Sequence, residues 1–352
     1  MKEYNMFLGM DIGDKFNTCC LLDSEGEIIR KFRVPCRTAR LASLFDELTP
    51  CVIAIEACTH SPWISRLAEA AGHKVLVGNP RKLRAIYDTP YKDDGRDAEL
   101  LARLARFEPR LLHPIHHRGE QAQADLMMLK ARQVMVSNRT KLINSVRGLL
   151  KSFDVRVATC SAACFHKKAR LVIPEILKEA IFPLLDAIEA HTTAVRDYDV
   201  RIAQISKERY DTETELLRSV SGVGPLTSLC FVLTLEEPNR IKHSRDVGAF
   251  LGLVPRRDQS GEIDKQLRIT KAGNKYLREL LVSASHYILG PHGPDTALRR
   301  WGLKLTERGG KNAKKRAVVA VARKLAVLLH RLWVTGEVYV AFPQTDRFME
   351  VA

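Results

Sequence analysis

Four carboxylates in the first part of the chain have the spacing of a site for divalent metal ions. Asp11 ends the first apolar run, and Glu56 ends the strand-like run after the first predicted helix. Asp94 and Asp97 are three residues apart at the start of a predicted helix, which puts both on one face. Phosphoryl transfer at two Mg²⁺ (or Mn²⁺) ions about 4 Å apart needs three or four carboxylates, because hard cations bind oxygen ligands. All four are therefore candidate metal ligands and candidate catalytic groups.

Each of these carboxylates also has a structural explanation. Asp11-Ile12-Gly13 fits a tight turn after a strand, and a Glu at a strand exit, such as Glu56, is usually just solvated. Asp94 fits a helix N-cap. The metal interpretation rests on the four residues together, because all of them fall on strand ends or on one helix face.

Residues 6–110 alternate strand and helix patterns, beginning with an antiparallel meander that turns at Ser24-Glu25-Gly26. The expected strands are Phe7–Ile12, Asn17–Leu22, Glu27–Val34, Cys51–Ile55 and Lys74–Val77. The expected helices are Thr38–Leu48, Pro62–Ala71 and Asp94–Phe107, with an irregular stretch over Pro80–Tyr91. The order β-β-β-α-β-α-β-α predicts a mixed sheet in a RuvC-like (ribonuclease-H-like) α/β domain over residues 1–115.

Residues 116–217 predict a helical coiled-coil connector. Its second long stretch carries seam positions that alternate four and three apart: Leu184, Ile188, His191, Val195, Tyr198, Ile202 and Ile205. Such a seam must bury its apolar side, either in an antiparallel hairpin with residues 126–153 or in a coiled coil between chains. We expect a homo-oligomer, a dimer or tetramer, joined through this seam, with the intrachain hairpin as the competing arrangement. His191 is expected to be a polar seam residue without a catalytic role.

Residues 218–340 predict a third, mostly helical domain. Ser221-Gly222-Val223-Gly224-Pro225 lies between the end of one helix and the start of the next, a pattern that resembles a helix-hairpin-helix. Backbone N–H groups at Gly222 and Gly224 can then hold a DNA phosphate without reading the base sequence. A Gly-x-Gly turn that only joins two helices is the alternative.

Positive charge is concentrated near the carboxyl end. The net charge is +15, and residues 251–331 contain 18 Lys or Arg against 6 Asp or Glu, an excess of +12. This field suits a nucleic-acid backbone, although charge does not distinguish DNA from RNA, and a generally basic surface is the alternative. The candidate nucleic-acid contacts are Arg256, Arg257, Arg268, Lys271, Lys311, Lys314, Lys315 and Arg316, and Arg323 and Lys324 continue the helical spacing of the last group.

The composition also limits the compartment and the partners. The eight cysteines include no Cys-x-x-Cys pair, which argues against a structural zinc site and fits a reducing cytoplasm. No run of about 18 apolar residues is present, so no membrane partner is expected.

Ser260 is a candidate nucleophile. Pro255–Ile263 has no helical periodicity and predicts a loop, in which Gly261 allows close backbone approach. A hydroxyl surrounded by basic residues, near a metal-bound phosphate, can attack once its proton is removed. A plain turn serine beside a glycine is the alternative.

Several motifs occur in an order that resembles a known family. Lys92-Asp93-Asp94-Gly95-Arg96-Asp97-Ala98 is similar to the Lys-Thr-Asp-x-x-Asp-Ala signature of DEDD-type insertion-sequence transposases, the insertion sequence 110 family. Asp93 stands where the family often has Thr, and Asp94 is taken as the ligand because it keeps the three-residue step to Asp97. The other similar segments are Gly9–Gly13, Ile53–Cys58, Val220–Pro225, Phe250–Pro255, Gln259–Gly261 and Arg268–Asn274. The resemblance covers nearly the whole chain.

The resemblance implies a recombinase of a bacterial mobile element, which acts at the nucleoid and cuts and rejoins donor and target DNA. It implies Mg²⁺ at the four carboxylates and Ser260 as the covalent nucleophile, so the active site is expected to assemble across domains, within one chain or between chains. It further implies a structured guide RNA, encoded by the element, that pairs with both DNAs.

Three other functions fit part of the sequence. A Holliday-junction endonuclease of the same fold would need the carboxylates but not Ser260, because metal-activated water would cut the DNA. A sugar kinase or actin-like ATPase also begins with a strand and Asp-x-Gly, but its second phosphate-binding hairpin and Gly-rich adenosine site are missing from the sequence. A non-catalytic DNA-binding protein would not need the four carboxylates in one cluster.

Overall fold

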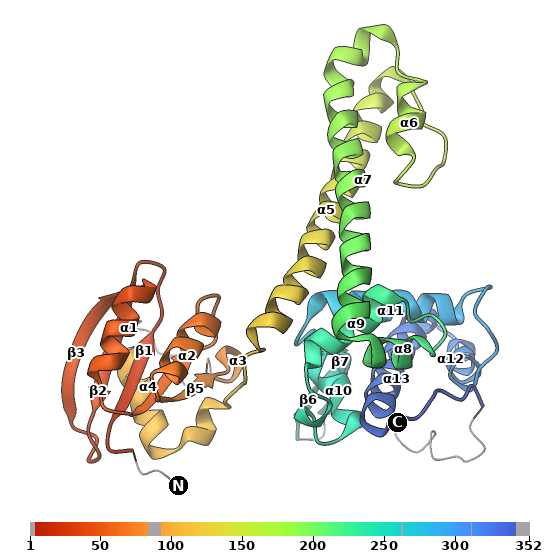
Figure 1. Ribbon diagram of the computed structural model, residues 1–352. Coiled ribbons are helices and arrows are strands. Elements are labelled where there is room, and N and C mark those ends of the chain that lie inside the picture. Colours follow the sequence, from red (N-terminus) through yellow and green to blue (C-terminus); the bar gives the residue numbers. More distant parts are fainter. Residues whose placement is uncertain (1–3, 84–92, 262, 311, 343–352) are drawn as a thin grey trace. The chain divides into compact units, whose positions relative to one another are not determined.

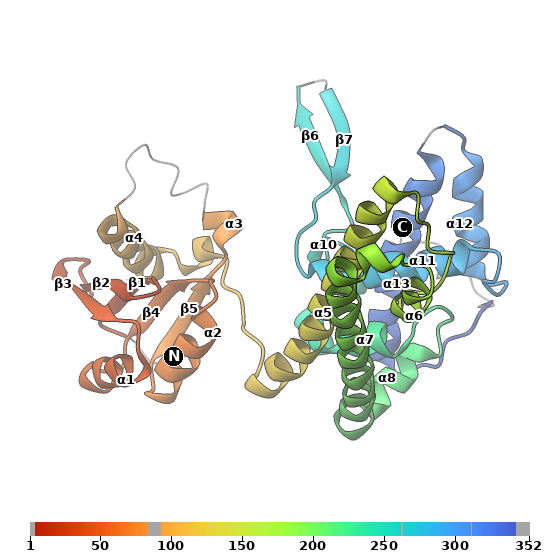
Figure 2. The same cartoon turned by 90° about the horizontal axis from the view of Figure 1, so that it is seen from above.

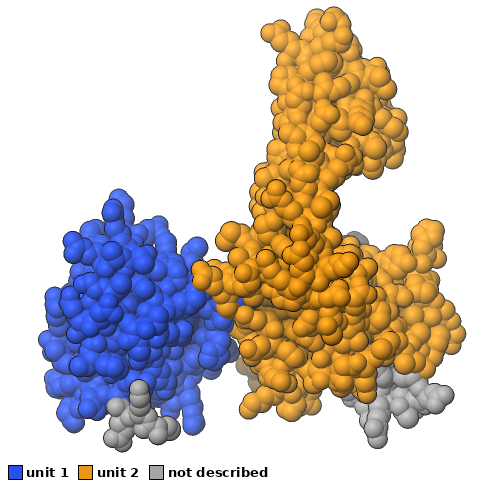
Figure 3. All heavy atoms as spheres, viewed as in Figure 1, with its two compact units in different colours: residues 1–118 blue, residues 119–352 orange. Residues whose placement is uncertain are grey.

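The chain folds into two compact units, residues 1–118 and 119–352 (Figure 3). The computed structural model describes residues 4–83, 93–261, 263–310 and 312–342. The expected helical domain and, apart from residues 116–118, the expected connector fall within the second unit. Among the described helices, none has an apolar stretch long enough to cross a membrane.

A mixed five-stranded sheet forms the centre of the first unit (Figure 1). Its strands lie in the order β3-β2-β1-β4-β5. The outer pairings β3–β2 and β2–β1 are antiparallel, and β1–β4 and β4–β5 are parallel. The bounds are β1 Phe7–Asp11, β2 Phe16–Leu22, β3 Ile28–Pro35, β4 Val52–Glu56 and β5 Lys74–Gly78. The predicted mixed sheet is confirmed, and each predicted strand is present within one residue at either end.

Helices cover both faces of this sheet (Figure 2). Alternate side chains of β1 and β4, such as Leu8 and Ile53, pack with α1 (Thr38–Glu47) and α2 (Ser61–Ala70). The other side chains of β4 pack with α4 (Asp94–Phe107), whose predicted bounds are confirmed. Part of the stretch expected to be irregular forms the short helix α3 (Pro80–Leu83), and residues 84–92 lie outside the described residues.

Gly9 allows α4 to lie directly against β1. A Cβ atom at this position would come within 1.9 Å of the Ala98 carbonyl oxygen and 2.5 Å of the Ala102 nitrogen. Any side chain here would therefore push the helix backbone away from the strand. The contact fixes the helix that carries Asp94 and Asp97 against the strand that ends at Asp11.

The second unit begins with a long antiparallel pair of helices, α5 (Glu120–Leu150) and α7 (Glu175–Arg209), with the short helix α6 (Phe165–Arg170) at the far end (Figure 1). Ile188 and Ile202 of α7 are fully buried in cores shared with α5 residues such as Val146 and Leu129. The seam is therefore buried within the chain, so the expected self-association through it is corrected in favour of the intrachain hairpin.

The buried row of α7 also differs from the expected seam. Leu185 and Thr192 are buried in place of Leu184 and His191. Thr192 can replace an apolar residue because its hydroxyl donates to the Ile188 carbonyl at 2.8 Å. His191 is half-buried, and its Nδ1 lies 2.7 Å from the Ala187 carbonyl oxygen.

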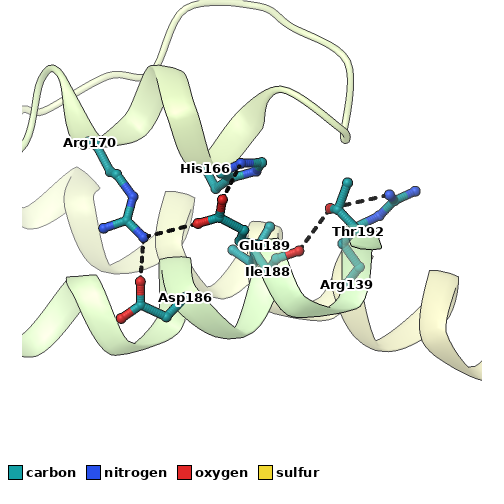
Figure 4. A network of polar contacts seen from close by, with 7 residues as sticks. All are labelled: Arg139, His166, Arg170, Asp186, Ile188, Glu189 and Thr192. Atoms are coloured by element: carbon teal, nitrogen blue, oxygen red, sulfur yellow. Dashed lines mark hydrogen bonds and ion pairs between the residues drawn. The ribbon is translucent and has the colours of Figure 1, made fainter. Parts of the chain in front are cut away.

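Polar contacts hold α6 against α7 (Figure 4). Arg170 is paired with Asp186 and Glu189, and the Nε2 of His166 lies 3.6 Å from a Glu189 carboxyl oxygen. Burial lowers the pKa of His166, which favours the neutral ring beside this network. Arg139 of α5 lies 3.4 Å from the Thr192 hydroxyl and so joins the network to the helix pair.

The rest of the second unit is mostly helical, as expected, around the helix α9, in which every residue from Thr227 to Leu235 is buried. The elements are α8 Asp211–Arg218, α9 Pro225–Leu235, α10 Val247–Phe250, β6 Pro255–Ser260, β7 Ile263–Ile269, α11 Lys275–Leu289, α12 Ala297–Glu307 and α13 Ala313–Thr335. The expectation of a loop around Ser260 was wrong. The strands β6 and β7 pair antiparallel and form a hairpin that projects from the body of this unit (Figure 2).

Candidate active site and nucleic-acid interface

Asp11 and Glu56 end two neighbouring parallel strands. The register pairs Met10 of β1 with Ile55 of β4, and Asp11 and Glu56 each follow by one residue. Side chains alternate along a strand, so Asp11 shares the face of Gly9, the residue on which α4 lies. Glu56 shares the face of Ala54, which packs in the core with α4. Asp11 and Glu56 therefore lie on the same face at the carboxyl edge of the sheet. Both side chains are half-buried.

Contacts along α4 show which of its ends lies at this edge. Arg103 and Arg106 donate to the carbonyls of Gly26 and Ser24, at 3.2 Å and 2.9 Å, in the turn between β2 and β3. That turn lies at the amino end of β1, because Leu22 pairs with Phe7. The first turn of α4 therefore lies toward the carboxyl end of β1. It carries Asp94, which is exposed, and Asp97, which is half-buried.

Asp93 is the N-cap of α4, the structural role that the sequence suggested for Asp94. The Asp93 carboxylate accepts a hydrogen bond from the Gly95 backbone nitrogen at 3.0 Å, and its φ of −143° is extended. Thr and Asp both cap helices through a side-chain oxygen. Asp93 therefore replaces the Thr of the similar signature without moving Asp94, which is the first helical residue.

The donor set at this edge consists of four carboxylates, the oxygen ligands that hard divalent cations prefer. The chemistry of the set therefore fits Mg²⁺ or Mn²⁺. Over the described residues, however, no three or more Asp, Glu, His or Cys side chains form a group that could hold a metal ion as they stand. The four residues share one edge of the unit without closing into a metal cage.

Ser260 is the last residue of β6, next to the tip of the hairpin, and is exposed. It pairs with Ile263 across the turn, where Gly261 has a φ of +54°, a value that favours glycine. Arg257 forms a two-pronged ion pair with Asp264, at 2.8 Å and 2.5 Å. The guanidinium lowers the pKa of that carboxyl, so the charge of Arg257 is partly balanced, whereas Arg256 and Arg268 are exposed on the same hairpin.

Two glycines join the base of the hairpin to the body of the unit. Gly252 and Gly273 have φ values of +69° and +67°, and a Cβ atom at either would come within 2.2 Å of backbone on the other segment. Lys271, at φ +54°, donates its backbone N–H to the Gly252 carbonyl at 3.1 Å and exposes its side chain. The motif segments Phe250–Pro255 and Arg268–Asn274 therefore form one support for the hairpin.

Gly222 and Gly224 lie in the turn between α8 and α9. Gly222 has a φ of +89°, and Gly224 is the N-cap of α9. A hollow of about 410 Å³ opens beside this turn and is lined in part by Ser283 and Tyr287 of α11. The two glycines thus lie between the end of one helix and the start of the next, as the sequence predicts.

Lys314, Lys315 and Arg316 are exposed in the first turn of α13, and Lys311 lies outside the described residues. Three cations at a helix N-terminus oppose the helix dipole, which favours anions there. Their placement therefore suits a phosphate ligand better than it suits the stability of the helix. This row of candidate contacts does not extend to Lys324, whose ammonium group is buried 4.4 Å from the Trp301 ring centroid, with its pKa lowered by burial.

Comparisons with known proteins agree with this layout. Residues 8–154 match the DEDD-type IS110 family model, described as a transposase, and residues 214–297 match the model described as the transposase IS116/IS110/IS902 family. The transposase for insertion sequence element IS1111A of Coxiella burnetii is 29% identical over 348 residues, 96% of this chain and 92% of that protein. The transposase for IS1328 of Yersinia enterocolitica is 27% identical over 283 residues, 79% and 82% of the two chains.

A Sinorhizobium fredii protein named as a transposase, y4qE, is 36% identical over 288 residues, 79% of this chain and 70% of that protein. These matches define an enzyme that cleaves and rejoins DNA, and the DEDD nuclease-like domain indicates that it uses a divalent metal. The chain belongs to the IS110 family of insertion-sequence transposases.

Proposed function

We propose that the chain transposes its insertion sequence by a metal-assisted attack of Ser260 on DNA. The observation that carries the proposal is that Asp11 and Glu56 end neighbouring parallel strands on the face that packs against α4, in a chain that also presents an exposed serine on a basic hairpin. The strand order β3-β2-β1-β4-β5, with helices on both faces, supports a RuvC-like domain for the first of these features.

The proposed step exchanges one ester bond for another. A bond forms between the Ser260 Oγ and the DNA phosphorus, and one phosphorus–deoxyribose oxygen bond breaks. The serine hydroxyl loses its proton, and the departing deoxyribose oxygen gains one. Bond energy is kept in the phosphoserine link, so rejoining needs no ATP.

The residues of this chain have distinct roles in that step. Asp11, Glu56, Asp94 and Asp97 would hold Mg²⁺ or Mn²⁺, which when bound offsets phosphate charge and lowers the pKa of an attacking hydroxyl. Arg256 and Arg268 neutralise charge that builds on the phosphate oxygens. A Holliday-junction type of cleavage by water is the second candidate, but membership in a transposase family does not favour it.

The nucleic-acid contacts are proposed from the charge and geometry of the second unit. The Gly222–Gly224 turn is proposed as a helix-hairpin-helix, and Lys271, Lys314, Lys315 and Arg316 as phosphate contacts. Each phosphate contact that is removed should lower the salt dependence of binding by about one unit of slope.

Metal removal tests the proposed chemistry. EDTA is expected to stop strand cleavage by the purified protein on DNA that carries the ends of its element, while DNA binding persists. Added Mg²⁺ or Mn²⁺ should restore cleavage, measured on denaturing gels. Ca²⁺ is the control, because its larger and looser coordination shell should support binding with little cleavage. Cleavage that continues in excess chelator would overturn the metal-assisted step.

We further propose that a structured guide RNA and a second copy of the chain take part. The excess of +12 over residues 251–331 suits such an RNA. Sequencing the RNA that copurifies with the protein is expected to return one transcript encoded beside its gene. A random sample of cellular RNA would contradict the guide.

A further inference from the structure

The β-sheet register extends the carboxylate edge in the other direction, onto β3. Asp11 pairs with Thr18 of β2, and Thr18 pairs with Arg33 of β3. Residues paired directly across strands point to the same face. Asp11, Thr18 and Arg33 therefore form one row on the face where α4 lies. With strands about 4.8 Å apart, the backbones of Arg33 and Asp11 are about 10 Å apart.

Phe16 stands on the same face, two residues before Thr18. Its side chain is 47% exposed, although aromatic rings usually dominate buried cores. The Arg33 guanidinium lies 5.3 Å from the centre of the Phe16 ring. This pair could not be predicted from sequence, because the two residues are 17 positions apart and only the β2–β3 register joins them.

Further positive charge surrounds this pair. Lys15 and Arg37 are exposed and lie close together, because the Cys36 backbone nitrogen donates to the Lys15 carbonyl at 2.9 Å. Within the part of the chain that the structure describes, neither they nor Arg33 form an ion pair. Asp14, the acidic group of this turn, lies 3.1 Å from His60. Several cations and an exposed ring therefore lie on the sheet face that carries Asp11.

We propose that Phe16 and Arg33 form a platform that holds single-stranded DNA beside the carboxylate edge. One unpaired base stacks on the exposed Phe16 ring, and Arg33, Lys15 and Arg37 contact its phosphates. Stacking suits an enzyme that must accept different sequences, because every base has a π-face. The cations offset the repulsion that a phosphate backbone meets on approach to four carboxylates. This inference rests on the proposed function, since it takes the carboxylate edge as the place of cleavage.

The alternative is that the pair only stabilises the edge of the sheet, and β3 itself provides the control. Arg30 lies 4.6 Å from the centre of the Phe32 ring, a contact of the same kind. Arg30 and Arg33 are three positions apart on the strand, so they point to opposite faces. Replacing Arg30 removes the same type of contact away from the carboxylates.

The test uses the full chain and a fluorescently labelled oligodeoxynucleotide of mixed sequence, followed by anisotropy. Phe16→Ala is expected to weaken binding about 5- to 100-fold, and Phe16→Trp to restore it. Arg33→Ala should weaken binding and lower the salt slope by about one. Arg30→Ala should bind like the wild type. Thermal melting of each variant reports whether the sheet is intact.

The outcomes separate this inference from the proposed function. If Phe16→Ala binds as tightly as the wild type, or if Arg30→Ala is equally impaired, the platform is wrong, whatever the carboxylate variants do. If loss is confined to an RNA strand of the same sequence, the assignment to DNA is wrong. If Phe16→Ala loses binding while Asp94→Asn still cleaves, the platform stands and the metal-site proposal fails.

Discussion

Replacing Ser260 with Ala is expected to abolish strand exchange, with a loss of about 10⁴-fold or more, the scale seen when a covalent nucleophile is removed. The substitution removes the attacking oxygen, and an exposed residue at the end of β6 contributes little to folding. DNA binding should therefore survive. Recombined product from a donor and a target plasmid measures the exchange, and anisotropy measures the binding.

The covalent link supplies the sharper readout. Wild-type protein on a nicked substrate should retain a DNA fragment on the peptide that contains Ser260, detectable by mass spectrometry after nuclease digestion. Ser24→Ala, at an exposed turn serine of the first unit, is the matched control and should behave as the wild type. Exchange by Ser260→Ala, or cleaved DNA without any adduct, would favour attack by water.

The first unit could be predicted closely from sequence because its elements have buried faces. Apolar runs such as Phe7–Asp11 and Val52–Glu56 are buried on both sides of the sheet, and their lengths fix the strands. The start of α4 was equally clear, because acidic residues precede an apolar face of Ala98 and Leu101. The N-cap residue of α4 could not be identified from sequence, because Asp93 and Asp94 can both cap a helix. The extended backbone of Asp93 distinguishes them.

The hairpin that carries Ser260 could not be predicted because its first strand, β6, has no buried face. Every residue of β6 is exposed, so no alternation of apolar and polar residues marks the strand. Cross-strand pairing and the Arg257–Asp264 ion pair hold it together instead. The carboxylate edge was predictable because its residues sit at the ends of buried elements, whereas Arg33 and Phe16 join it only through the register of an edge strand.

Asp94→Asn is expected to lower strand cleavage by about a thousandfold, while Asp93→Thr leaves it near the wild-type rate. The first change removes one carboxylate charge without altering shape, and loss of a metal ligand removes several kcal/mol of transition-state stabilisation. The second keeps an N-cap oxygen for the Gly95 backbone nitrogen and restores the residue of the family signature. Asp93→Ala should fall between them, since losing the cap costs about 1 kcal/mol at the start of α4.

The test ranks the three variants by their initial cleavage rates at saturating Mg²⁺, and DNA binding is checked separately. An Asp93→Thr protein as inactive as Asp94→Asn would mean that Asp93 is the ligand.

Mixing the Asp94→Asn and Ser260→Ala proteins then extends the test, because each supplies the group that the other lacks. Recovered exchange in the mixture is expected if one chain's carboxylates serve another chain's serine. No recovery, with both proteins bound to DNA, would restrict the chemistry to a single chain.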